Sequence, residues 1–216
     1  MIKIRVYDPD KYYDNDKGRN ITINIAPGYT CLVGPNGVGK STMLEQIRDI
    51  LRQEKDSETG LHKYEVVYYD NLHDGGSKQF GMWMMNGMFE KIAAITSSSE
   101  GEGIIYNITE FAMQCGVATK KCIEKNRTLI ILIDGLDSGT SIDKIYKFKS
   151  EFIDTIIDHC SQSNVEAYII ATANNYAMID DEIVDCIFAK NGKHMKFKTY
   201  NSFRKFILKN AKETES

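Results

Sequence analysis

One segment near the start of the chain combines glycines, a lysine and a hydroxyl residue at a spacing that suits phosphate chemistry. Residues 34–41 match the pattern G-x-x-x-x-G-K-[ST]. Gly37 and Gly39 would let the backbone curl so that its N–H groups point at phosphate oxygens, and the positive end of the following helix would add to them. Lys40 would lie between β- and γ-phosphates, and Ser41 would offer its hydroxyl to Mg²⁺. The predicted nucleotide contacts are Gly34, Pro35, Asn36, Gly37, Val38, Gly39, Lys40, Ser41 and Thr42.

A second chemical signal is an aspartate at the end of an aliphatic run. Residues 128–134 read Thr-Leu-Ile-Ile-Leu-Ile-Asp, and a continuous aliphatic run is typical of a parallel strand that is buried on both faces. A phosphate loop needs a second anchor for magnesium, which is usually such an aspartate. We therefore expect Asp134 to hold the metal together with Ser41.

These residues need strands that end, and helices that begin, at the right places. Apolar residues alternate with polar ones over 2–6 and 21–25, as in half-buried strands, and a third strand over 30–33 leads into the phosphate loop. Helical spacing follows directly over 42–53. Further strands are expected at 63–69, 128–133 and 167–172. Further helices are expected at 80–95, from 100 towards 116, at 142–160 and at 202–212. A hairpin is expected about 191–192. The pattern favours one α/β domain over 1–216 with an antiparallel start.

Composition excludes several other classes of protein. The chain has 216 residues, of which 42% are hydrophobic and 26% charged, as in a globular domain with a real core. Its longest aliphatic run, 129–133, is too short to cross a membrane, and its start lacks the apolar segment of a signal peptide, so we expect a cytoplasmic protein without membrane insertion. Five scattered cysteines without a CxxC pair argue against a disulfide framework or a zinc site.

Charge is unevenly distributed along the chain. The net charge is −3, yet residues 190–212 contain eight Lys or Arg and no acidic residue. A solvated edge hairpin and helix would account for this stretch. A nucleic-acid partner is the alternative hypothesis, and it would require an affinity that falls steeply with salt.

Residues 134–141, Asp-Gly-Leu-Asp-Ser-Gly-Thr-Ser, resemble the D-E-P-x-S-G-L-[DS] segment of the ATP-binding cassette (ABC-type) ATPases. Residues 99–102 resemble the family signature S-G-G-[QE], and residues 183–193 resemble its late strand and turn. The resemblance implies an α/β P-loop NTPase fold with an antiparallel β-subdomain, a parallel central sheet and a reduced helical subdomain at about 71–118. The interval between 70 and 96 is too short for the helical subdomain of a transporter, and it has no heptads for coiled-coil arms. The chain therefore resembles the compact head domains of SMC- and RecF-like ATPases.

The chain departs from this family at the position that normally activates water. Gly135 stands where the family has a glutamate, and glycine cannot act as a general base. Asp137, or Glu102 from an opposite subunit, could orient the water instead. Asn174 lies one residue beyond the family's switch histidine and is a candidate γ-phosphate sensor.

Other family positions suggest further contacts with the nucleotide. Asp70 or Asn71 would occupy the Q-loop position, which makes Asp70 a possible metal ligand, and Tyr12 or Tyr13 could stack on the adenine. The resemblance also implies a head-to-tail homodimer. In it the signature residues of one subunit, Ser98, Ser99, Glu100 and Gly101, would face the γ-phosphate that is held by the other.

Three functions remain open from the sequence. The first is a slow ATPase whose ATP-dependent dimerisation acts on a partner. The second is a nucleotide switch that dimerises but hardly hydrolyses, in which Gly135→Glu would restore turnover. The third is a small-molecule kinase. ATP rather than GTP as the ligand rests on the family resemblance.

Overall fold

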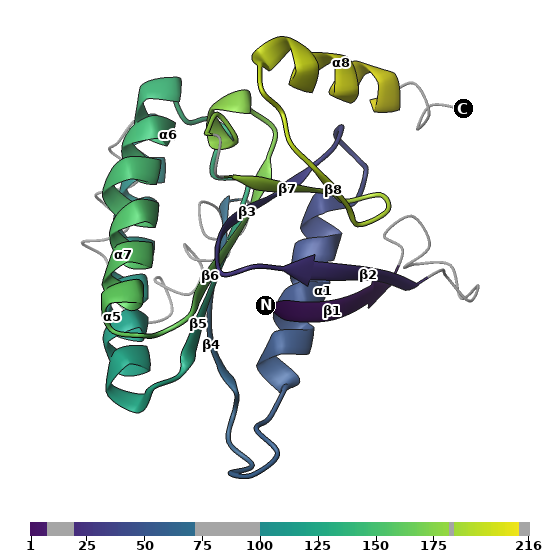
Figure 1. The fold of residues 1–216 in the computed structure, drawn as a ribbon. Coiled ribbons are helices and arrows are strands. Elements are labelled where there is room, and N and C mark those ends of the chain that lie inside the picture. The colour runs from purple at the N-terminus through teal and green to yellow at the C-terminus, as the bar shows by residue number, and fades with distance from the viewer. Residues whose placement is uncertain (8–19, 72–99, 182–183, 212–216) are drawn as a thin grey trace, which may run out of the picture.

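The computed structural model describes residues 1–7, 20–71, 100–181 and 184–211, and only the backbone of 100–107. A six-stranded sheet forms its centre (Figure 1). In sequence order the strands are β3 (Gly28–Val33), β4 (Tyr64–Asp70), β5 (Thr128–Asp134), β6 (Ala167–Ala173), β7 (Asp185–Phe188) and β8 (Lys193–Met195). They lie in the order β4-β5-β6-β3-β7-β8, and every pair is parallel except β7 with β8.

This strand order gathers the chemically interesting residues at one edge of the sheet. Parallel strands end at the same edge, so β3, β4, β5 and β6 deliver their last residues side by side. Asp70 pairs in register with Asp134. Val33, the last residue before the glycine-rich loop, pairs with Ala173.

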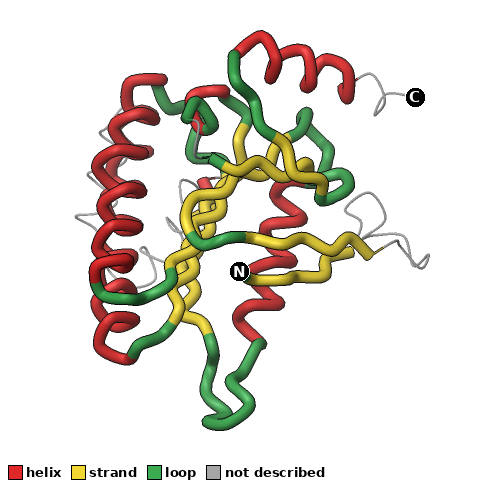
Figure 2. Tube along the Cα trace, in the orientation of Figure 1, coloured by secondary structure: helices red, strands yellow, loops and turns green. Residues whose placement is uncertain are grey.

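Helices cover both faces of this sheet (Figures 1 and 2). On one face lies α1 (Lys40–Gln53). On the other lie α5 (Glu100–Lys125) and the pair α6 (Ile142–Phe148) and α7 (Asp154–Gln162), which a π-helical turn joins. Neighbouring residues of a central strand enter opposite cores: Ile131 packs with the α5–α7 side and Leu132 with the α1 side. The aliphatic run of β5 is therefore buried on both faces, as predicted.

A separate two-stranded ribbon packs on the α1 side of the sheet. β1 (Ile2–Tyr7) and β2 (Asn20–Ile25) are antiparallel, and their inward residues are buried while the alternate residues are exposed. The turn between β7 and β8 fits tightly against this ribbon. A Cβ added to Gly192 would lie 2.5 Å from Ile21 and 2.9 Å from Ile23. The predicted antiparallel start and parallel centre are both confirmed.

The last helix, α8 (Tyr200–Ala211), packs through aromatic side chains. Phe203 is buried, and Phe206 meets Phe188 of β7 edge-on, with 4.9 Å between ring centres. A short 3₁₀ turn, Tyr176–Met178, follows β6, and Tyr176 lies 5.9 Å from the Phe203 ring. Aromatic contacts thus join α8 to the sheet and to the turn after β6.

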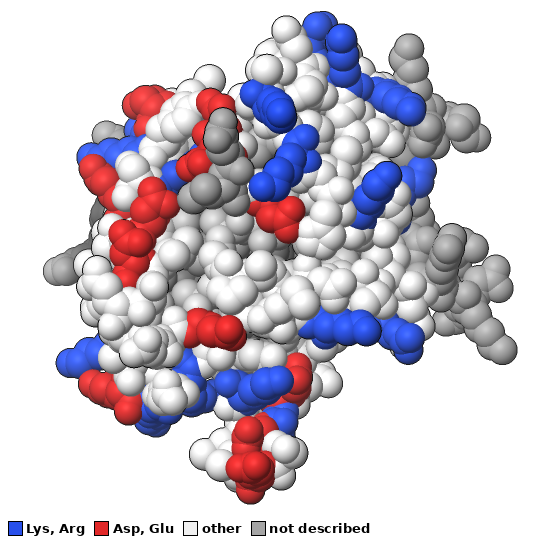
Figure 3. Space-filling view, in the orientation of Figure 1, with Lys and Arg blue, Asp and Glu red and all other residues white. Residues whose placement is uncertain are grey.

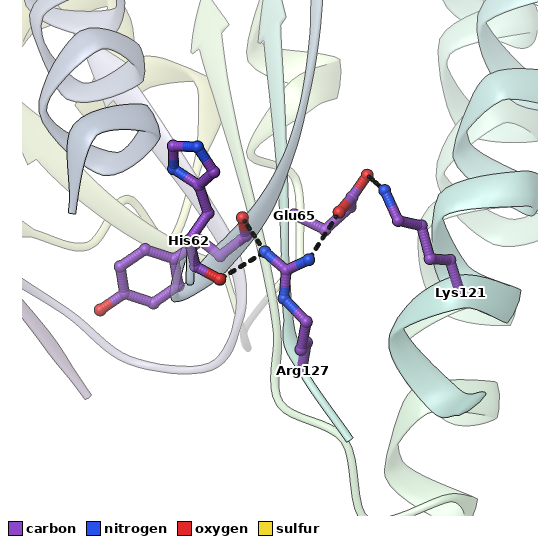
Figure 4. A network of polar contacts seen from close by, with 5 residues as sticks. His62, Glu65, Lys121 and Arg127 are labelled. Atoms are coloured by element: carbon purple, nitrogen blue, oxygen red, sulfur yellow. Dashed lines mark hydrogen bonds and ion pairs between the residues drawn. The ribbon is translucent and has the colours of Figure 1, made fainter. Parts of the chain in front are cut away.

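A polar network fastens the start of β4 to α5 and β5 (Figure 4). Arg127 donates hydrogen bonds to the carbonyl oxygens of His62 and Tyr64 at 2.5 and 2.8 Å. Glu65 accepts from Arg127 at 3.3 Å and from Lys121 at 2.6 Å. This network joins β4, the strand at one edge of the sheet, to α5, which lies far from it in the sequence. It therefore helps to fix the position of α5 on the sheet.

The predicted helices differ from the observed ones in two informative ways. The helix expected to end near Gly116 continues to Lys125, because Ala118 and Cys122 extend its buried face at a spacing of four residues. The helix expected over 142–160 contains the π-helical turn Lys149–Ile153, which hydropathy spacing does not indicate. The helix expected over 80–95 lies outside the described residues.

Candidate functional site

The glycine-rich segment forms a loop between β3 and α1. Gly37 and Gly39 have φ values of 81° and 90°, which glycine adopts readily. The ammonium group of Lys40, in the first turn of α1, donates to the carbonyl oxygens of Gly34 at 2.8 Å and Pro35 at 3.1 Å. Burial lowers the pKa of Lys40, and the carboxylates of Asp137 and Asp134 oppose that effect. The loop thus holds a buried cation with one N–H still available for a ligand.

Ser41 and Asp134 lie at the same edge of the sheet, where both line one cavity. Asp134 ends β5 and is 7% exposed. Burial raises the pKa of this carboxyl group, and hydrogen bonds from Thr172 and Ser41 counteract the rise. The Thr172 hydroxyl donates to Asp134 at 2.7 Å and accepts from the N–H of Gly135 at 2.9 Å. Thr172 therefore orients the carboxylate and the backbone that follows it.

A second carboxylate and an amide border the same edge. Asp70 is buried beside Asp134, and its negative charge contributes to the raised pKa of Asp134. Asn71 accepts a hydrogen bond from the Tyr69 hydroxyl at 3.1 Å and donates to the carbonyl oxygen of Ser138 at 3.0 Å. Asn71 thus connects the end of β4 to the loop after β5.

Gly135 adopts a backbone conformation that other residues disfavour. Its φ is +68°, and a Cβ added there would lie 3.4 Å from the Cβ of Asn71 and 3.9 Å from the hydroxyl of Ser138. There is room for a side chain, but the left-handed backbone strains any L-residue. The expected rescue by Gly135→Glu therefore has a structural cost that the sequence does not reveal.

Asp137 binds the turn that follows β6. Its carboxylate accepts hydrogen bonds from the backbone N–H groups of Asn174 and Asn175, both at 2.6 Å, and from the Asn174 amide at 3.2 Å. It is 8% exposed. These contacts fix the backbone of Asn174 and direct its side chain, so Asp137 is placed to position Asn174.

A cavity of about 400 Å³ unites most of these groups. Among the predicted site residues, its lining includes Asn36, Gly37, Gly39, Lys40, Ser41, Thr42, Asp70, Asn71, Asp134 and Asn174. Gly34, Pro35 and Val38 belong to the loop but do not line the cavity; Val38 is buried and would contact a Cβ at Gly34. Asp137 stands behind Asn174 rather than in the lining.

The structure leaves part of the prediction unplaced. Glu100, Gly101 and Glu102 form the start of α5, where only the backbone is described. Ser98, Ser99, Tyr12 and Tyr13 lie outside the described residues. The signature assignment and the adenine contact therefore stay predictions.

Sequence reasoning missed Thr172 and Ser138, which both line the cavity. Thr172 is the one small hydroxyl residue near the end of the otherwise mostly apolar strand Ala167–Ala173, which lies next to the strand that ends in Asp134. A polar residue near the end of a buried central strand could have indicated it. For Ser138 the sequence offers no comparable signal.

The donor set fits magnesium bound with a triphosphate. Mg²⁺ prefers oxygen ligands and usually takes one or two from the protein beside phosphate oxygens. Ser41 and Asp134 supply a hydroxyl and a carboxylate to the lining of one cavity, and Asp70 adds a carboxylate beside Asp134. Among the described residues, no group of three or more His, Cys, Asp or Glu side chains could hold a metal alone. None of the described helices is long and apolar enough to cross a membrane.

Comparisons with solved structures find similar chains of low identity. The chain is similar to the ADP conformation of MJ1267, an ATP-binding cassette of an ABC transporter, with 14% identity over 100% of both chains and a TM-score of 0.48. It is similar to a nucleotide-free cassette from an ABC transporter, with 16% identity over 99% of this chain and 98% of that chain and a TM-score of 0.46. A third similar chain is Stu0660 of Streptococcus thermophilus, with 10% identity over 87% of this chain and 74% of that chain and a TM-score of 0.48.

The family comparison covers nearly the whole chain. No curated protein sequence matches it. Residues 5–215 match the model of the AAA domain family. The match includes the phosphate loop, the strand that ends in Asp134, and both layers of helices. The chain therefore belongs to the AAA domain family, and its phosphate loop lies between a strand of a mostly parallel sheet and a helix, as in P-loop NTPases.

Proposed function

We propose that this chain binds Mg-ATP, hydrolyses it slowly, and acts on a partner protein through an ATP-dependent head-to-tail homodimer. One observation carries the nucleotide site: Lys40, Ser41 and Asp134 converge on one cavity at the carboxyl edge of a parallel sheet. A lysine, a hydroxyl and a carboxylate in this arrangement suit a triphosphate and its metal ion. ATP as the nucleotide rests on the family.

In this proposal Ser41 and Asp134 hold the metal ion, and Asp70 is a further candidate ligand. The bound ion would neutralise negative charge on the phosphate oxygens. Thr172 keeps the Asp134 carboxylate oriented through its 2.7 Å hydrogen bond. The free N–H of Lys40 would face the phosphates.

We expect slow turnover because the carboxylates near Gly135 are already committed to other contacts. Among the described residues, the carboxylates that line the cavity are Asp70 and Asp134, both on the metal side. Asp137 uses its oxygens to bind Asn174 and Asn175, which favours a positioning role over direct activation of water. Asn174, held in this way, is the proposed sensor of the γ-phosphate. Glu102 from the opposite subunit remains the candidate for orienting water.

The dimer is supported by where α5 begins. Glu100 starts this helix, and the N-terminus of a helix carries a partial positive charge that favours phosphate. Ser98, Ser99, Glu100 and Gly101 of one subunit would then face the nucleotide of the other. ATP would join the subunits, and loss of the γ-phosphate would release them.

The test combines mass with turnover. Light scattering on the protein with Mg-ATP, with Mg-ADP and without nucleotide gives the oligomeric state, and phosphate release is measured on the same samples. We expect a dimer with Mg-ATP only, together with slow release of phosphate. A monomer in every condition would refute the signature assignment.

A matched pair of variants tests the site itself. Thr172→Val removes the hydroxyl that orients Asp134, and we expect the affinity for Mg-ATP to fall about 10- to 100-fold. The control is Thr119→Val, because Thr119 is equally buried but bonds only a carbonyl of its own helix. Equal affinities for the two variants would contradict the proposed metal geometry.

Two alternatives give different results in these assays. A dimer with Mg-ATP but no phosphate release would favour a non-hydrolysing nucleotide switch, which the glycine at 135 also supports. Consumption of ATP by a monomer, dependent on an added acceptor, would favour a small-molecule kinase.

A further inference from the structure

Six cations gather on the surface formed by β8, the segment after it and α8. They are Lys193, Lys196, Lys198, Arg204, Lys205 and Lys209, here called the basic face. All six are exposed, and none forms an ion pair with another described residue. Unpaired like charges on one surface repel one another, so an arrangement like this gains most from an anionic partner.

Acidic side chains are scarce around the basic face. Residues 190–211 include none. The nearest strand carries Asp185, which His194 of β8 contacts at 2.7 Å. Figure 3 shows Lys and Arg spread over α8 and the surface below it, whereas Asp and Glu gather over α6 and α7. The molecule is acidic elsewhere, so this face is a local feature rather than a consequence of net charge.

The packing of α8 favours a nucleic acid over a membrane surface as the partner. A helix that lies on a membrane must insert a free apolar face between lipids. In α8 that face is already used: Phe203 is buried, and Phe206 and Ile207 pack against the two cores. Its outward stripe consists of Asn201, Arg204, Lys205, Leu208 and Lys209. Such a stripe suits a hydrated polyanion better than a lipid layer.

The cations of the outward stripe lie close enough together to meet neighbouring phosphates. From Arg204 to Lys209 the helix rises about 7.5 Å, which is about two phosphate spacings along one strand of a duplex. Tyr200, at the start of α8, is 58% exposed and offers an aromatic ring beside the cations. Exposed aromatic rings among basic residues suit bases or sugars.

We propose that the basic face binds the phosphate backbone of a nucleic acid. The basic face requires no bound nucleotide, so this proposal can be tested independently of the proposed ATPase activity. It nevertheless lies close to the phosphate loop. Phe206 of α8 contacts Phe188, and Phe188 would lie 3.2 Å from a Cβ on Gly34. The helix that carries the basic face is therefore linked to that loop through one aromatic ring.

The test is fluorescence anisotropy with the full chain and a labelled DNA duplex of about 30 base pairs, and with one of its strands alone, from about 50 to about 200 mM salt. The test variant is the triple Arg204→Glu, Lys205→Glu, Lys209→Glu. The control is the triple Lys120→Glu, Lys125→Glu, Lys144→Glu, which changes net charge equally at exposed positions on α5 and α6.

We expect the wild type and the control to bind, and the test variant to bind at least about 10-fold more weakly. The slope of log affinity against log salt should lessen by about three, close to one unit for each lost phosphate contact. Mg-ATP binding, measured on the same proteins, checks that the fold and the nucleotide site persist.

Three results would overturn the proposal. The first is no binding of either DNA by the wild type at the lowest salt. The second is equal weakening by both triple variants, which would show an effect of net charge alone. The third is binding to vesicles that contain anionic lipid without binding to DNA, which would identify a membrane as the partner.

Discussion

The left-handed backbone of Gly135 predicts how substitutions there affect stability. We expect Gly135→Ala to lower the free energy of unfolding by about 1–2 kcal/mol, the cost of placing an L-residue in this conformation. Steric crowding adds little, because the nearest atom to the new Cβ is the Cβ of Asn71 at 3.4 Å. Gly135→Asn should cost less than Gly135→Ala, because asparagine tolerates a positive φ better.

The measurement is thermal and urea unfolding of the two variants and the wild type. For a chain of this length, 1–2 kcal/mol corresponds to a fall in Tm of about 2–8 °C. Gly116→Ala is the control of opposite sign, because Gly116 lies inside α5 with nothing within 4 Å of an added Cβ. It should stabilise the protein by about 0.5–1 kcal/mol.

Two results would refute this reasoning. One is a Gly135→Ala variant as stable as the wild type, and the other is an asparagine that costs as much as alanine. The same strain changes how a rescue of turnover must be tested. Gly135→Glu should be compared with Gly135→Gln, which carries the same backbone strain without a carboxylate, so that any gain in turnover can be assigned to the charge.

Three further predictions concern the scaffold. Arg127→Met removes the hydrogen-bond donor to the carbonyl groups of His62 and Tyr64 and the ion pair with Glu65. It should therefore lower the free energy of unfolding by about 1–3 kcal/mol. The control Arg204→Met, at an exposed position, should change that free energy by less than about 0.5 kcal/mol. Gly192→Ala drives a methyl group against Ile21 and Ile23, so it should loosen the ribbon and lower Tm, and an unchanged Tm would mean that the turn can shift freely. Burial raises the pKa of Cys122 and Cys186 to about 12, so neither thiol should react with Ellman's reagent at pH 8 unless urea unfolds the chain. In the unfolded chain these two thiols ionise near pH 8.5, whereas in the folded chain they stay protonated at that pH. The free energy of unfolding should therefore fall as the pH rises above about 8.5.

The sequence predicted the residues whose role depends on local spacing. The phosphate loop, the strand that ends in Asp134 and the alternation in β1 and β2 are all periodic or motif signals, and the structure contains each element. Thr172 was missed because its role depends on the register between β5 and β6, which brings it to Asp134 across 38 positions of sequence. Register is a property of the assembled sheet.

Asp137 is a second residue whose contacts depend on the assembled fold. Its place three residues after Asp134 suggested contact with water, which is an inference from distance along the chain. In the fold the carboxylate accepts hydrogen bonds from the N–H groups after β6, contacts that distance along the chain does not indicate, and its role toward water stays a prediction. The π-helical turn at Lys149–Ile153 was invisible for a related reason, since Lys149 donates to the carbonyl oxygen of Ala177, a partner that only the tertiary structure brings near.

Gln46 of α1 affects how the molecule resists aggregation. Its side-chain amide accepts a hydrogen bond from the N–H of Tyr7 at 2.7 Å and donates to the carbonyl oxygen of Tyr7 at 3.3 Å. A short exposed ribbon would otherwise offer the unpaired groups at its end to a strand from another molecule. With those of Tyr7 occupied, and with Lys3 and Arg5 exposed along β1, the ribbon is protected against edge-to-edge growth by a residue of the helix that follows the phosphate loop.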